Sequence, residues 1–480
     1  MSEEMGLTVK KSEDFSKWYL EVLQKSEVLD ERYGVKGFVI YMPTGTFLLR
    51  RMQDIFEEGL QKTGHKAVIF PVIIPEKNLS KETEHIKGFE GEVFWITHGG
   101  YNKLEERLCL RPTSETAFYP MYSIWLRSHT QLPFKLYQAV SAYRAETKMT
   151  KPLIRGREFF WIEAHTAQKT FEDADKQVEE DMGIFEKGLS SLCLPFLLCQ
   201  RPEWDKFAGA EKTHAYDAVL PDGKVLQIGT THNLGEKFSK PFDIKYMDQN
   251  GKKTYVNQTT FGIGLSRIIG ALVAIHGDDK GLILPPAVAP TQIVIVPIYT
   301  AETKTKVMEK AGELLGKLEE KNFRVILDDR EGKTPGFKFH EWELKGVPLR
   351  IEIGPRDLEK GQVVLTRRDF LERIPIAEEK LEEQALEVLD SIGFQLQKRA
   401  KELLKVTEAK TIKDMKKALE EKGGFVHIDF CGHESCAKKI KDDTGAEVRG
   451  TIVGKKEPAK GNCVVCGKKA VQKVYAARSY

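Results

Sequence analysis

The stretch YRAETKMTKPLIRGREFFWIEAH, Tyr143–His165, decides the fold class of this chain. Pro152 and Gly156 argue against one continuous helix, so we expect a strand, a basic loop and a second strand. Arg144 and Glu146 are two residues apart and would share one face of the first strand. Charges of both signs are therefore concentrated between two strand-like segments.

Further strand-like segments follow without helices between them. This order favours an antiparallel sheet with helices on one face, that is, an α+β fold. A helix is expected near Thr46–Thr63, where apolar residues recur at helical spacing. The segment 66–75 contains a proline, which predicts an edge or interface strand. The expected strands are KAVIFPVIIP (66–75), KLYQAVSAYR (135–144), REFFWIEAHTA (157–167), KVLQIGTTHNL (224–234) and KKTYVNQTTFGIG (252–264).

The pattern changes after the proline-rich linker LPPAVAP, Leu284–Pro290. Strands and amphipathic helices then alternate as β-α-β-α-β, which predicts a small α/β domain to about Arg373. A long charged helical stretch, Ala377–Glu421, leads to a cysteine-rich end. We therefore expect three domains: an antiparallel-sheet domain over 1–286, an α/β domain over 287–400 and a small α+β domain over 401–480.

Composition limits the function classes. The 480 residues are 41% hydrophobic and 30% charged, as in ordinary multidomain globular proteins. No apolar run approaches the roughly 20 residues of a membrane-spanning helix, and the first residues are too polar for a signal peptide. A cytoplasmic location without a membrane is expected. The net charge is only +3, so nucleic-acid contacts must come from local patches.

Four of the seven cysteines lie in the last fifty residues, as CGHESC and CVVC. Such paired spacing in a cytosolic chain indicates a metal more often than disulfides. Four thiolates would form a closed, tetrahedral, structural zinc site. Replacement of one ligand by His433, or reduced thiols without metal, are the alternatives. The expected ligands are Cys431, Cys436, Cys463 and Cys466.

Two segments carry features of a nucleotide site. Arg144 offers a permanent charge that suits phosphate or carboxylate, and Phe159 offers a flat partner for adenine. In TTFGIGLSRIIGALV, Gly262 and Gly264 allow close backbone approach, and Arg267 would stand in the first turn of a helix. A solvated basic loop and a packed strand–helix junction are the plainer interpretations.

Together these segments resemble motifs two and three of a class II aminoacyl-tRNA synthetase. Motif one would be MPTGTFLLRRMQDIFEEGLQKTGHKAVIFPVIIP, Met42–Pro75. The loop CLRPTSETAFYP, the strand W-x-E-x-H at Trp161–His165 and the segment Asp205–Gly235 resemble the prolyl-tRNA synthetases. With the cysteine module, nearly the whole chain resembles their archaeal or eukaryote-like type. Two departures are the reading GIGLSR in motif three and the lack of room for the large editing insertion of bacterial relatives.

The resemblance implies a proline–tRNA ligase that forms prolyl-adenylate from L-proline and ATP, with Mg²⁺. Two anions must meet, so positive charge and positioning would dominate catalysis. Arg144 would bridge the proline carboxylate and the α-phosphate, and Arg267 with Arg155 would hold the other phosphates. Gln227 is also a candidate for a position near Mg²⁺. The implied nucleotide-binding residues are Arg144, Glu146, Arg155, Phe159, Gln227, Thr230 and Arg267, of which Arg144 and Arg267 would be catalytic.

A small pocket for proline is implied on the same sheet. Thr113 and Glu115 would accept hydrogen bonds from the secondary ammonium group. Plain core packing is the alternative for Trp161 and Phe207. Because a small pocket separates similar side chains by only about 1–3 kcal/mol, misactivation of cysteine and alanine is expected. The implied pocket residues are Thr113, Glu115, Arg144, Trp161, Glu163, His165, Phe207 and His232.

The α/β domain would bind the anticodon of tRNA(Pro), and motif one would form a homodimer with Pro71 or Pro75 at its interface. Arginine and carboxylate side chains suit guanine-rich anticodons, although each is singly more typical of a surface charge. Activation without tRNA charging and a non-catalytic zinc-bearing RNA-binding protein are the rival functions. The resemblance also implies that the terminal Tyr480 docks against the catalytic domain close to the substrate pocket. The candidate anticodon-reading residues are Arg350, Glu352, Arg356, Arg367 and Arg368.

Overall fold

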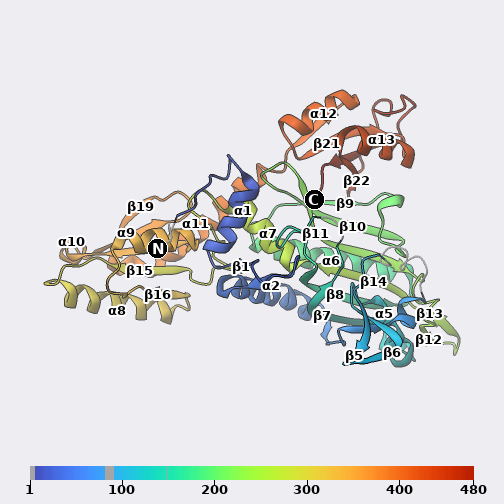
Figure 1. Ribbon diagram of the computed structural model, residues 1–480, viewed down its shortest axis with the longest axis horizontal. Coiled ribbons are helices and arrows are strands. Elements are labelled where there is room, and N and C mark those ends of the chain that lie inside the picture. The colour runs from blue at the N-terminus through green and yellow to red at the C-terminus, as the bar shows by residue number, and fades with distance from the viewer. Residues whose placement is uncertain (1–5, 82–90, 147–148) are drawn as a thin grey trace.

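The computed structural model describes residues 6–81, 91–146 and 149–480. Thr147 and Lys148 of the expected basic loop therefore lie outside the described residues. Within them, no helix is long and apolar enough to cross a bilayer. Figure 1 shows an elongated molecule in which the α/β part lies at one end and the cysteine-rich part rises from the antiparallel sheet.

The first part of the chain is built on antiparallel strands, and this confirms the expected α+β class. Strands β7, β8, β14, β11, β10 and β9 are neighbours in this order, and each adjacent pair is antiparallel. The helices are α1 (Phe15–Lys25), α2 (Pro43–Lys62), α3 (Glu76–Leu79), α5 (Glu115–Trp125), α6 (Phe171–Ser191) and α7 (Leu265–His276). The strands are β1 (Leu29–Asp30), β2 (Ile40–Tyr41), β3 (Lys66–Ala67), β4 (Ile73–Pro75), β5 (Trp95–Gly99), β6 (Asn102–Leu110), β7 (Phe134–Tyr143), β8 (Glu158–Gln168), β9 (Leu197–Gln200), β10 (Lys212–Val219), β11 (Val225–Gly235), β12 (Lys245–Met247), β13 (Lys253–Tyr255) and β14 (Asn257–Ile263).

Two expected strands of this part are each divided. Lys66–Pro75 forms β3, which pairs with β7, and β4, which pairs with β6 in another sheet. Pro71 lies between them and has no amide hydrogen for a ladder, so the chain changes sheets there. Residues 252–264 likewise form β13, which pairs with β12, and β14 of the main sheet.

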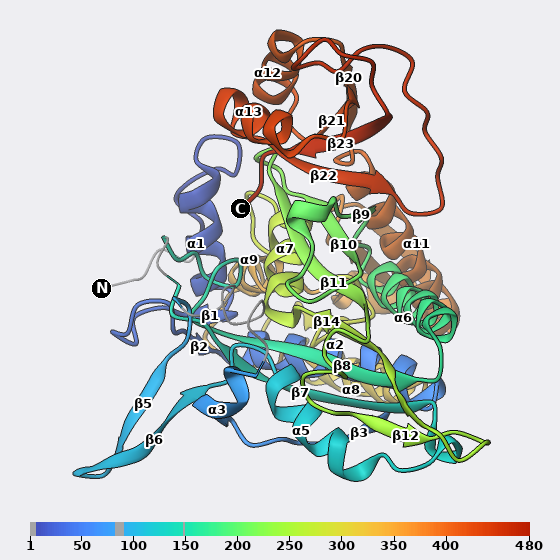
Figure 2. The same ribbon diagram turned by 90° about the vertical axis from the view of Figure 1, so that its right-hand side faces the viewer.

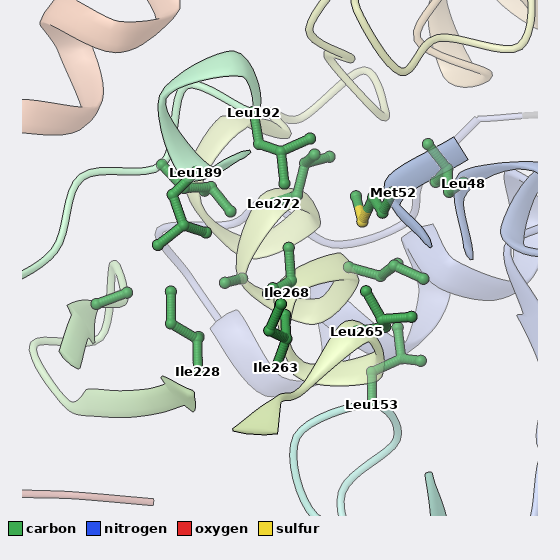
Figure 3. Close-up of a cluster of buried hydrophobic side chains, with 14 of the residues drawn as sticks. Leu48, Met52, Leu153, Leu189, Leu192, Ile228, Ile263, Leu265, Ile268 and Leu272 are labelled. Atoms are coloured by element: carbon green, nitrogen blue, oxygen red, sulfur yellow. The ribbon is translucent and has the colours of Figure 1, made fainter. Parts of the chain in front are cut away.

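Helices α2, α6 and α7 cover one face of the main sheet. Apolar side chains of these helices interlock with Ile228 of β11 and Ile263 of β14 (Figure 3). Burial of this cluster fixes the helices against the sheet because apolar surface leaves water. The opposite face of β8, β11 and β14 remains available for polar side chains.

The second part is a five-stranded sheet in the order β16-β15-β17-β18-β19, with β15 parallel to β16 and β17. It confirms the expected α/β pattern and extends beyond Arg373, because β19 and α11 complete its core. Its elements are β15 (Ile293–Pro297), α8 (Lys304–Glu320), β16 (Val325–Leu327), α9 (Pro335–Leu344), β17 (Leu349–Ile353), α10 (Pro355–Glu359), β18 (Gln362–Arg367), β19 (Arg373–Ala377) and α11 (Leu381–Lys401).

The expected helical stretch Ala377–Glu421 is wrong as one unit. Helix α11 ends at Lys401. The β-branched residues Val406 and Thr407 then begin strand β20, which pairs in parallel with β21. As a strand, this segment pairs its backbone with β21 and buries Ala409 in a separate apolar cluster with residues of α12, β21 and α13. The carboxyl-terminal elements are β20 (Val406–Ala409), α12 (Ile412–Glu421), β21 (Phe425–Phe430), α13 (Glu434–Thr444), β22 (Glu447–Ile452) and β23 (Gln472–Ala477).

The carboxyl-terminal strands join the main sheet. Strand β22 pairs antiparallel with β9 through Thr451 opposite Gln200 and Ile452 opposite Cys199. The result is one sheet of 11 strands, in the order β20-β21-β23-β22-β9-β10-β11-β14-β8-β7-β3. Figure 2 shows the strands continuing from the red carboxyl-terminal part into the green β9, β10 and β11. The edge of the antiparallel sheet is thereby covered.

A glycine on α6 tests the packing of α6 against α2. A Cβ atom at Gly188 would lie 2.1 Å from the Phe56 ring, whereas one at Gly183 of the same helix would meet nothing within 4 Å. Gly188→Ala should destabilise the protein by about 1–3 kcal/mol through overpacking. Gly183→Ala should instead stabilise the helix by roughly 0.5–1 kcal/mol. Denaturant unfolding measures both, and equal midpoints for the two variants would contradict this packing.

Candidate active site

A hollow of about 240 Å³ opens on the polar face of the sheet, and Arg144, Arg155 and Arg267 all line it. Arg144 follows the last residue of β7, Arg155 belongs to the loop before β8, and Arg267 lies in the first turn of α7. Antiparallel pairing of β8, β14 and β11 brings these distant segments together. All seven expected nucleotide-binding residues border this hollow: Arg144, Glu146, Arg155, Phe159, Gln227, Thr230 and Arg267.

Arg144 lies between aromatic rings and backbone. Its Nε donates a hydrogen bond to the carbonyl of Pro112 at 3.2 Å. Its guanidinium carbon is 5.2 Å from the ring centroid of Phe159 and 5.8 Å from that of Trp161. Burial lowers the pKa of Arg144, and nearby carboxylates oppose this effect. The side chain therefore keeps its charge in a poorly hydrated place, where attraction of an anion is strong.

Arg267 is held by two backbone carbonyls. Its Nε donates to Ile154 at 3.0 Å and its Nη1 to Gln227 at 3.0 Å. Burial lowers its pKa to about 10, and repulsion from Arg144 and Arg155 adds to this. A bound polyanion would relieve that repulsion. Glu146 balances part of the charge, since its carboxylate lies 3.5 Å from Nη1 of Arg155.

A second hollow of about 280 Å³ adjoins the first and shares Arg144, Trp161, Gln227 and Thr230 with it. Seven of the eight expected proline-pocket residues line it: Thr113, Glu115, Arg144, Trp161, Glu163, Phe207 and His232. The structure thus brings a small pocket with carboxylates and rings next to the arginine-rich hollow. Arg144 stands where the two meet.

His165 is the exception among the expected pocket residues. It is fully buried and lies behind the pocket, where its Nε2 is 3.3 Å from the Glu163 carboxylate. His165 therefore contacts the hollow through Glu163, and its place in the proline pocket stays a prediction. Side chains alternate along β8, and Trp161, Glu163 and His165 share one face, but the helix α5 covers His165 through Phe118 and Tyr119.

The polar groups of the pocket have fixed states. Thr113 Oγ1 donates to Glu115 at 2.5 Å. Burial raises the pKa of Glu163, but hydrogen bonds from His165, Ser114 and Gln138 outweigh burial and lower it. Burial lowers the pKa of His232 to about 3, so this imidazole is neutral. A cationic ammonium group would thus meet the ionised Glu163 carboxylate and a neutral ring.

The carboxyl-terminal Tyr480 docks against the catalytic part of the chain, as expected, but it lines neither of the two hollows, so its closeness to the substrate pocket stays a prediction. Its amide donates to the Val225 carbonyl at 3.1 Å, and its hydroxyl donates to Asp222. The ammonium groups of Lys151 and Lys224 lie 5.0 and 5.1 Å from its ring centroid. Lys151 belongs to the same loop as Arg155, so the carboxyl-terminal tail contacts a loop that lines the first hollow.

The four cysteines predicted as metal ligands come together. Their sulfur atoms all lie within 4.8 Å of one another, and Cys466 alone is exposed. Burial raises the pKa of the Cys463 thiol, but backbone amides of Cys466, Val465 and Cys431 outweigh burial and lower it to about 7. His433 is exposed and is not in the group. The donor set therefore fits a tetrahedral thiolate site.

The expected anticodon-reading residues are mostly buried. Arg350, Glu352, Arg367 and Arg368 are at most 9% exposed, and each forms an ion pair inside the protein. Only Arg356, on α10, is exposed among the five expected residues. Another hollow lies at the carboxyl ends of β15 and β16, and its lining includes Tyr299, Lys304, Arg330, Glu331, Lys333 and Lys338. It is mostly basic, although Lys304 pairs with Glu331, and Arg330 and Lys338 pair with Asp328. The sequence shows that these strands carry charged residues, but it does not show which face of the sheet the helices cover and therefore which charges are buried.

Comparison with known proteins identifies the three parts. Residues 94–276 match the class II tRNA synthetase core domain of the G, H, P, S and T enzymes. Residues 292–387 match an anticodon binding domain, and residues 412–480 match the prolyl-tRNA synthetase C-terminal domain. The proline–tRNA ligase of Thermofilum pendens is 50% identical over 99% of this chain and 100% of its own length. That of Pyrococcus abyssi is 47% identical over 98% of both.

The chain belongs to the prolyl-tRNA synthetase family. It is a class II aminoacyl-tRNA synthetase, a proline–tRNA ligase. A solved prolyl-tRNA synthetase from Giardia lamblia, in complex with prolyl-adenylate, superposes with a TM-score of 0.95. It is 38% identical and covers 99% of this chain and 100% of its own.

Three polar residues of this prolyl-tRNA synthetase site were not expected from the sequence. Arg201 and Arg449 line the second hollow, and Asp217 lies between them. Arg201 directly follows β9 and Asp217 lies on β10. The sequence does not show that either charge is buried, and Arg449 is 232 residues from Asp217. Only the pairing of β22 with β9 shows that they meet.

Loss of one thiolate should open the cysteine site of this prolyl-tRNA synthetase. Cys463→Ser should lower the zinc content of purified protein from about one ion per chain and loosen the last segment, since metal binding contributes to folding. Metal analysis and limited proteolysis measure the two effects. Cys199→Ser, a buried cysteine outside the group, is the control. Full zinc content in the Cys463 variant would exclude that residue as a ligand.

Proposed function

We propose that the chain joins L-proline to ATP in the two adjoining hollows and then transfers the prolyl group to the 3′ end of tRNA(Pro). The observation that carries this proposal is the position of Arg144 at the junction of an arginine-rich hollow and a small acidic pocket. A carboxylate and a phosphate are both anions, and a guanidinium between them allows their approach.

The first step needs positioning more than proton transfer. A proline carboxylate oxygen attacks the α-phosphorus, the bond from that phosphorus to the bridging oxygen breaks, and pyrophosphate leaves. Arg144 binds both reacting groups, while Arg155 and Arg267 bind the departing phosphates. Phe159 stacks on adenine, and Thr230 borders the nucleotide. In the second step a terminal hydroxyl of tRNA attacks the activated carbonyl and AMP leaves.

The second hollow suits the proline ring. Glu115 and Thr113 lie at one wall and accept hydrogen bonds from the secondary ammonium group, while Glu163 supplies a second negative charge. Trp161 and Phe207 form apolar walls, and the Phe207 ring lies 4.8 Å from the His232 ring. A small, rigid ring fits between such walls with little loss of conformational entropy.

Metal ions complete the proposed chemistry. Magnesium would bind mainly through the ATP phosphates and waters. The Glu146 carboxylate is the protein group that would supply an oxygen ligand, since magnesium prefers oxygen ligands. The magnesium ion would neutralise charge on the phosphates. Zinc would be structural and held by Cys431, Cys436, Cys463 and Cys466, which leave no open position for catalysis.

The basic hollow of the α/β part is proposed to take the tRNA(Pro) anticodon. Tyr299 offers a ring for stacking, and Lys304, Arg330 and Lys333 offer charge for phosphates and guanine edges. Arg356 remains a second candidate because it is exposed. The buried Arg350, Glu352, Arg367 and Arg368 are proposed to support this sheet and not to read bases.

Three further features belong to the proposal. The chain divides functionally at 286/287 and 400/401, into catalytic, anticodon-binding and zinc-binding domains. A homodimer forms through the motif 1 region, where Ile69 is 87% and Ile73 is 41% exposed beside the exposed Pro71. The cytoplasm is the compartment in which this tRNA charging would take place.

Amino-acid-dependent exchange of pyrophosphate into ATP tests the proposed function. With twenty amino acids supplied separately, proline should give the highest rate, and labelled proline should then appear on tRNA(Pro). Exchange without labelling of tRNA would indicate activation for another purpose. Absence of exchange would indicate a non-catalytic protein.

Arg144→Ala should abolish proline-dependent exchange. Removal of the guanidinium leaves two anions facing each other, and loss of one such electrostatic group costs about 3–4 kcal/mol, or a hundredfold or more in rate. Arg356→Ala, on an exposed face of the anticodon part, should leave exchange unchanged. An Arg144→Ala enzyme that retains its fold by circular dichroism and exchanges within tenfold of wild type would contradict the role of Arg144.

Cysteine and alanine should be activated at measurable rates. Both fit a pocket built for proline, and exclusion of a smaller side chain provides only about 1–3 kcal/mol. Exchange with each amino acid, compared with a blank lacking amino acid and with tryptophan as the bulky control, measures the effect. If cysteine and alanine behave like tryptophan, the walls of the pocket discriminate more strongly than this geometry allows.

A further inference from the structure

Arg449 brings the carboxyl-terminal domain into the active site. It lies on β22, is 5% exposed and lines the second hollow together with Arg201. Its neighbour Gly450 has φ +104°, and a Cβ atom there would lie 1.8 Å from the carbonyl oxygen of Gln200. Only glycine allows β22 to approach β9 this closely. The approach places the Arg449 side chain beneath the catalytic sheet edge.

Arg449 binds the buried carboxylate of Asp217 through two hydrogen bonds. Its Nε and Nη2 donate to the two oxygens of Asp217 at 3.0 and 2.8 Å. Burial raises the pKa of Asp217, but the charges of Arg201 and Arg449 outweigh burial and lower it to about 2. Asp217 is therefore ionised at every working pH, and the bidentate pair is permanent.

The carboxylate orients a second arginine. Arg201 donates through Nη2 to Asp217 at 2.8 Å and through Nη1 to the backbone carbonyl of Arg449 at 2.8 Å. The Nη2 of Arg201 also donates to Oε1 of Gln227 at 3.0 Å. Two partners thus hold the Arg201 guanidinium: Asp217, which the Arg449 side chain binds, and the main-chain carbonyl of Arg449.

The contact with Arg201 decides which way the Gln227 carboxamide faces. A guanidinium only donates hydrogen bonds, so the atom of Gln227 that faces Arg201 must be its oxygen. The amide nitrogen then takes the other side of the group. Gln227 borders both hollows, at the place where a nucleotide would pass from one to the other.

We propose that Arg449 is a positioning residue: through Asp217 and Arg201 it sets Gln227 as a hydrogen-bond donor to an acceptor oxygen of the bound nucleotide. The carboxyl-terminal domain thereby sets the nucleotide affinity of the catalytic domain. This inference rests on the proposed function, since it assigns a nucleotide to the junction of the hollows. It also makes Gln227 a poor magnesium ligand, because its oxygen is already engaged.

A double-mutant cycle on the full chain tests the chain of contacts. Arg449→Met should raise the KM for ATP in proline-dependent exchange about tenfold, which corresponds to about 1.4 kcal/mol. The KM for proline should change much less. Gln227→Leu should raise the KM for ATP similarly, and adding Arg449→Met to Gln227→Leu should change it by less than twofold. A merely structural role of Arg449 would not depend on Gln227.

Controls separate this effect from a folding defect. Lys473→Met removes a cation from β23 of the same domain that pairs only with Glu408 among the described contacts, and it should leave both KM values unchanged. Zinc content and the unfolding midpoint are measured for every variant. If Arg449→Met does not fold, Arg449→Lys, which keeps the charge and loses the bidentate geometry, enters the same cycle.

The outcomes are distinct. Coupling between Arg449 and Gln227 supports the inference. Fully additive effects, or an unchanged KM for ATP in the folded Arg449 variants, overturn it while the proposed function stands. A wild-type protein that shows no proline-dependent exchange overturns the proposed function and this inference with it.

Discussion

Concentration of positive charge in a poorly hydrated hollow is the constraint on which this structure depends. Arg144, Arg155 and Arg267 repel one another, and burial makes each charge costly. Backbone carbonyls of Pro112, Ile154 and Gln227 compensate part of that cost, and Glu146 compensates another part. The positive charge that remains would be neutralised by a bound polyphosphate and a carboxylate. The site is therefore rigid before substrates arrive, and catalysis by positioning requires that rigidity.

The antiparallel sheet supplies the rigidity. Strands β8, β14 and β11 hold Phe159, Trp161, Gln227 and Thr230 at fixed spacings, and α7 presents Arg267 from the end of β14. The helices on the opposite face anchor these strands through the apolar cluster of Figure 3. Arg144 and Arg155 lie on the segment between β7 and β8, and the pairing of these two strands fixes both ends of that segment.

Joining of the carboxyl-terminal strands to this sheet has a functional consequence. The cysteine-rich carboxyl-terminal part is packed into the rest of the protein, because β22 continues the sheet from β9 and Tyr480 packs beside β11. The four cysteines lie in the same part of the chain as the strand that carries Arg449 to the second hollow. The cysteine cluster, the sheet edge and the second hollow thus belong to one continuous packed structure.

Much of the fold and site follows from local sequence patterns. The strands β7, β8 and β11 and the helix α2 have clear periodicity, and the arginines and glycines that flank them mark the nucleotide hollow. Those local patterns could not predict which strands pair when they lie far apart in the sequence. The division of 66–75 between two sheets, the entry of β20 after α11 and the union of β22 with β9 depend on partners far along the chain.

Burial of charged groups was equally hidden from the sequence. Arg350 and Glu352 satisfy one another inside the α/β domain, and Arg368 reaches Asp278 of the catalytic part. A charged residue on a strand shows neither which face is covered nor which partner lies opposite. The full burial of His165 was hidden for the same reason, since α5 covers its end of β8.

Binding of a stable analogue of prolyl-adenylate, in which a sulfamate replaces the phosphate, tests the central claim most directly. A crystal structure of the complex should show the prolyl group between Trp161 and Phe207, adenine against Phe159 and Arg144 bonded to the linking group, with little movement of β8, β11 and β14. An analogue bound outside the two hollows, or an Arg144 side chain turned away from it, would contradict the account.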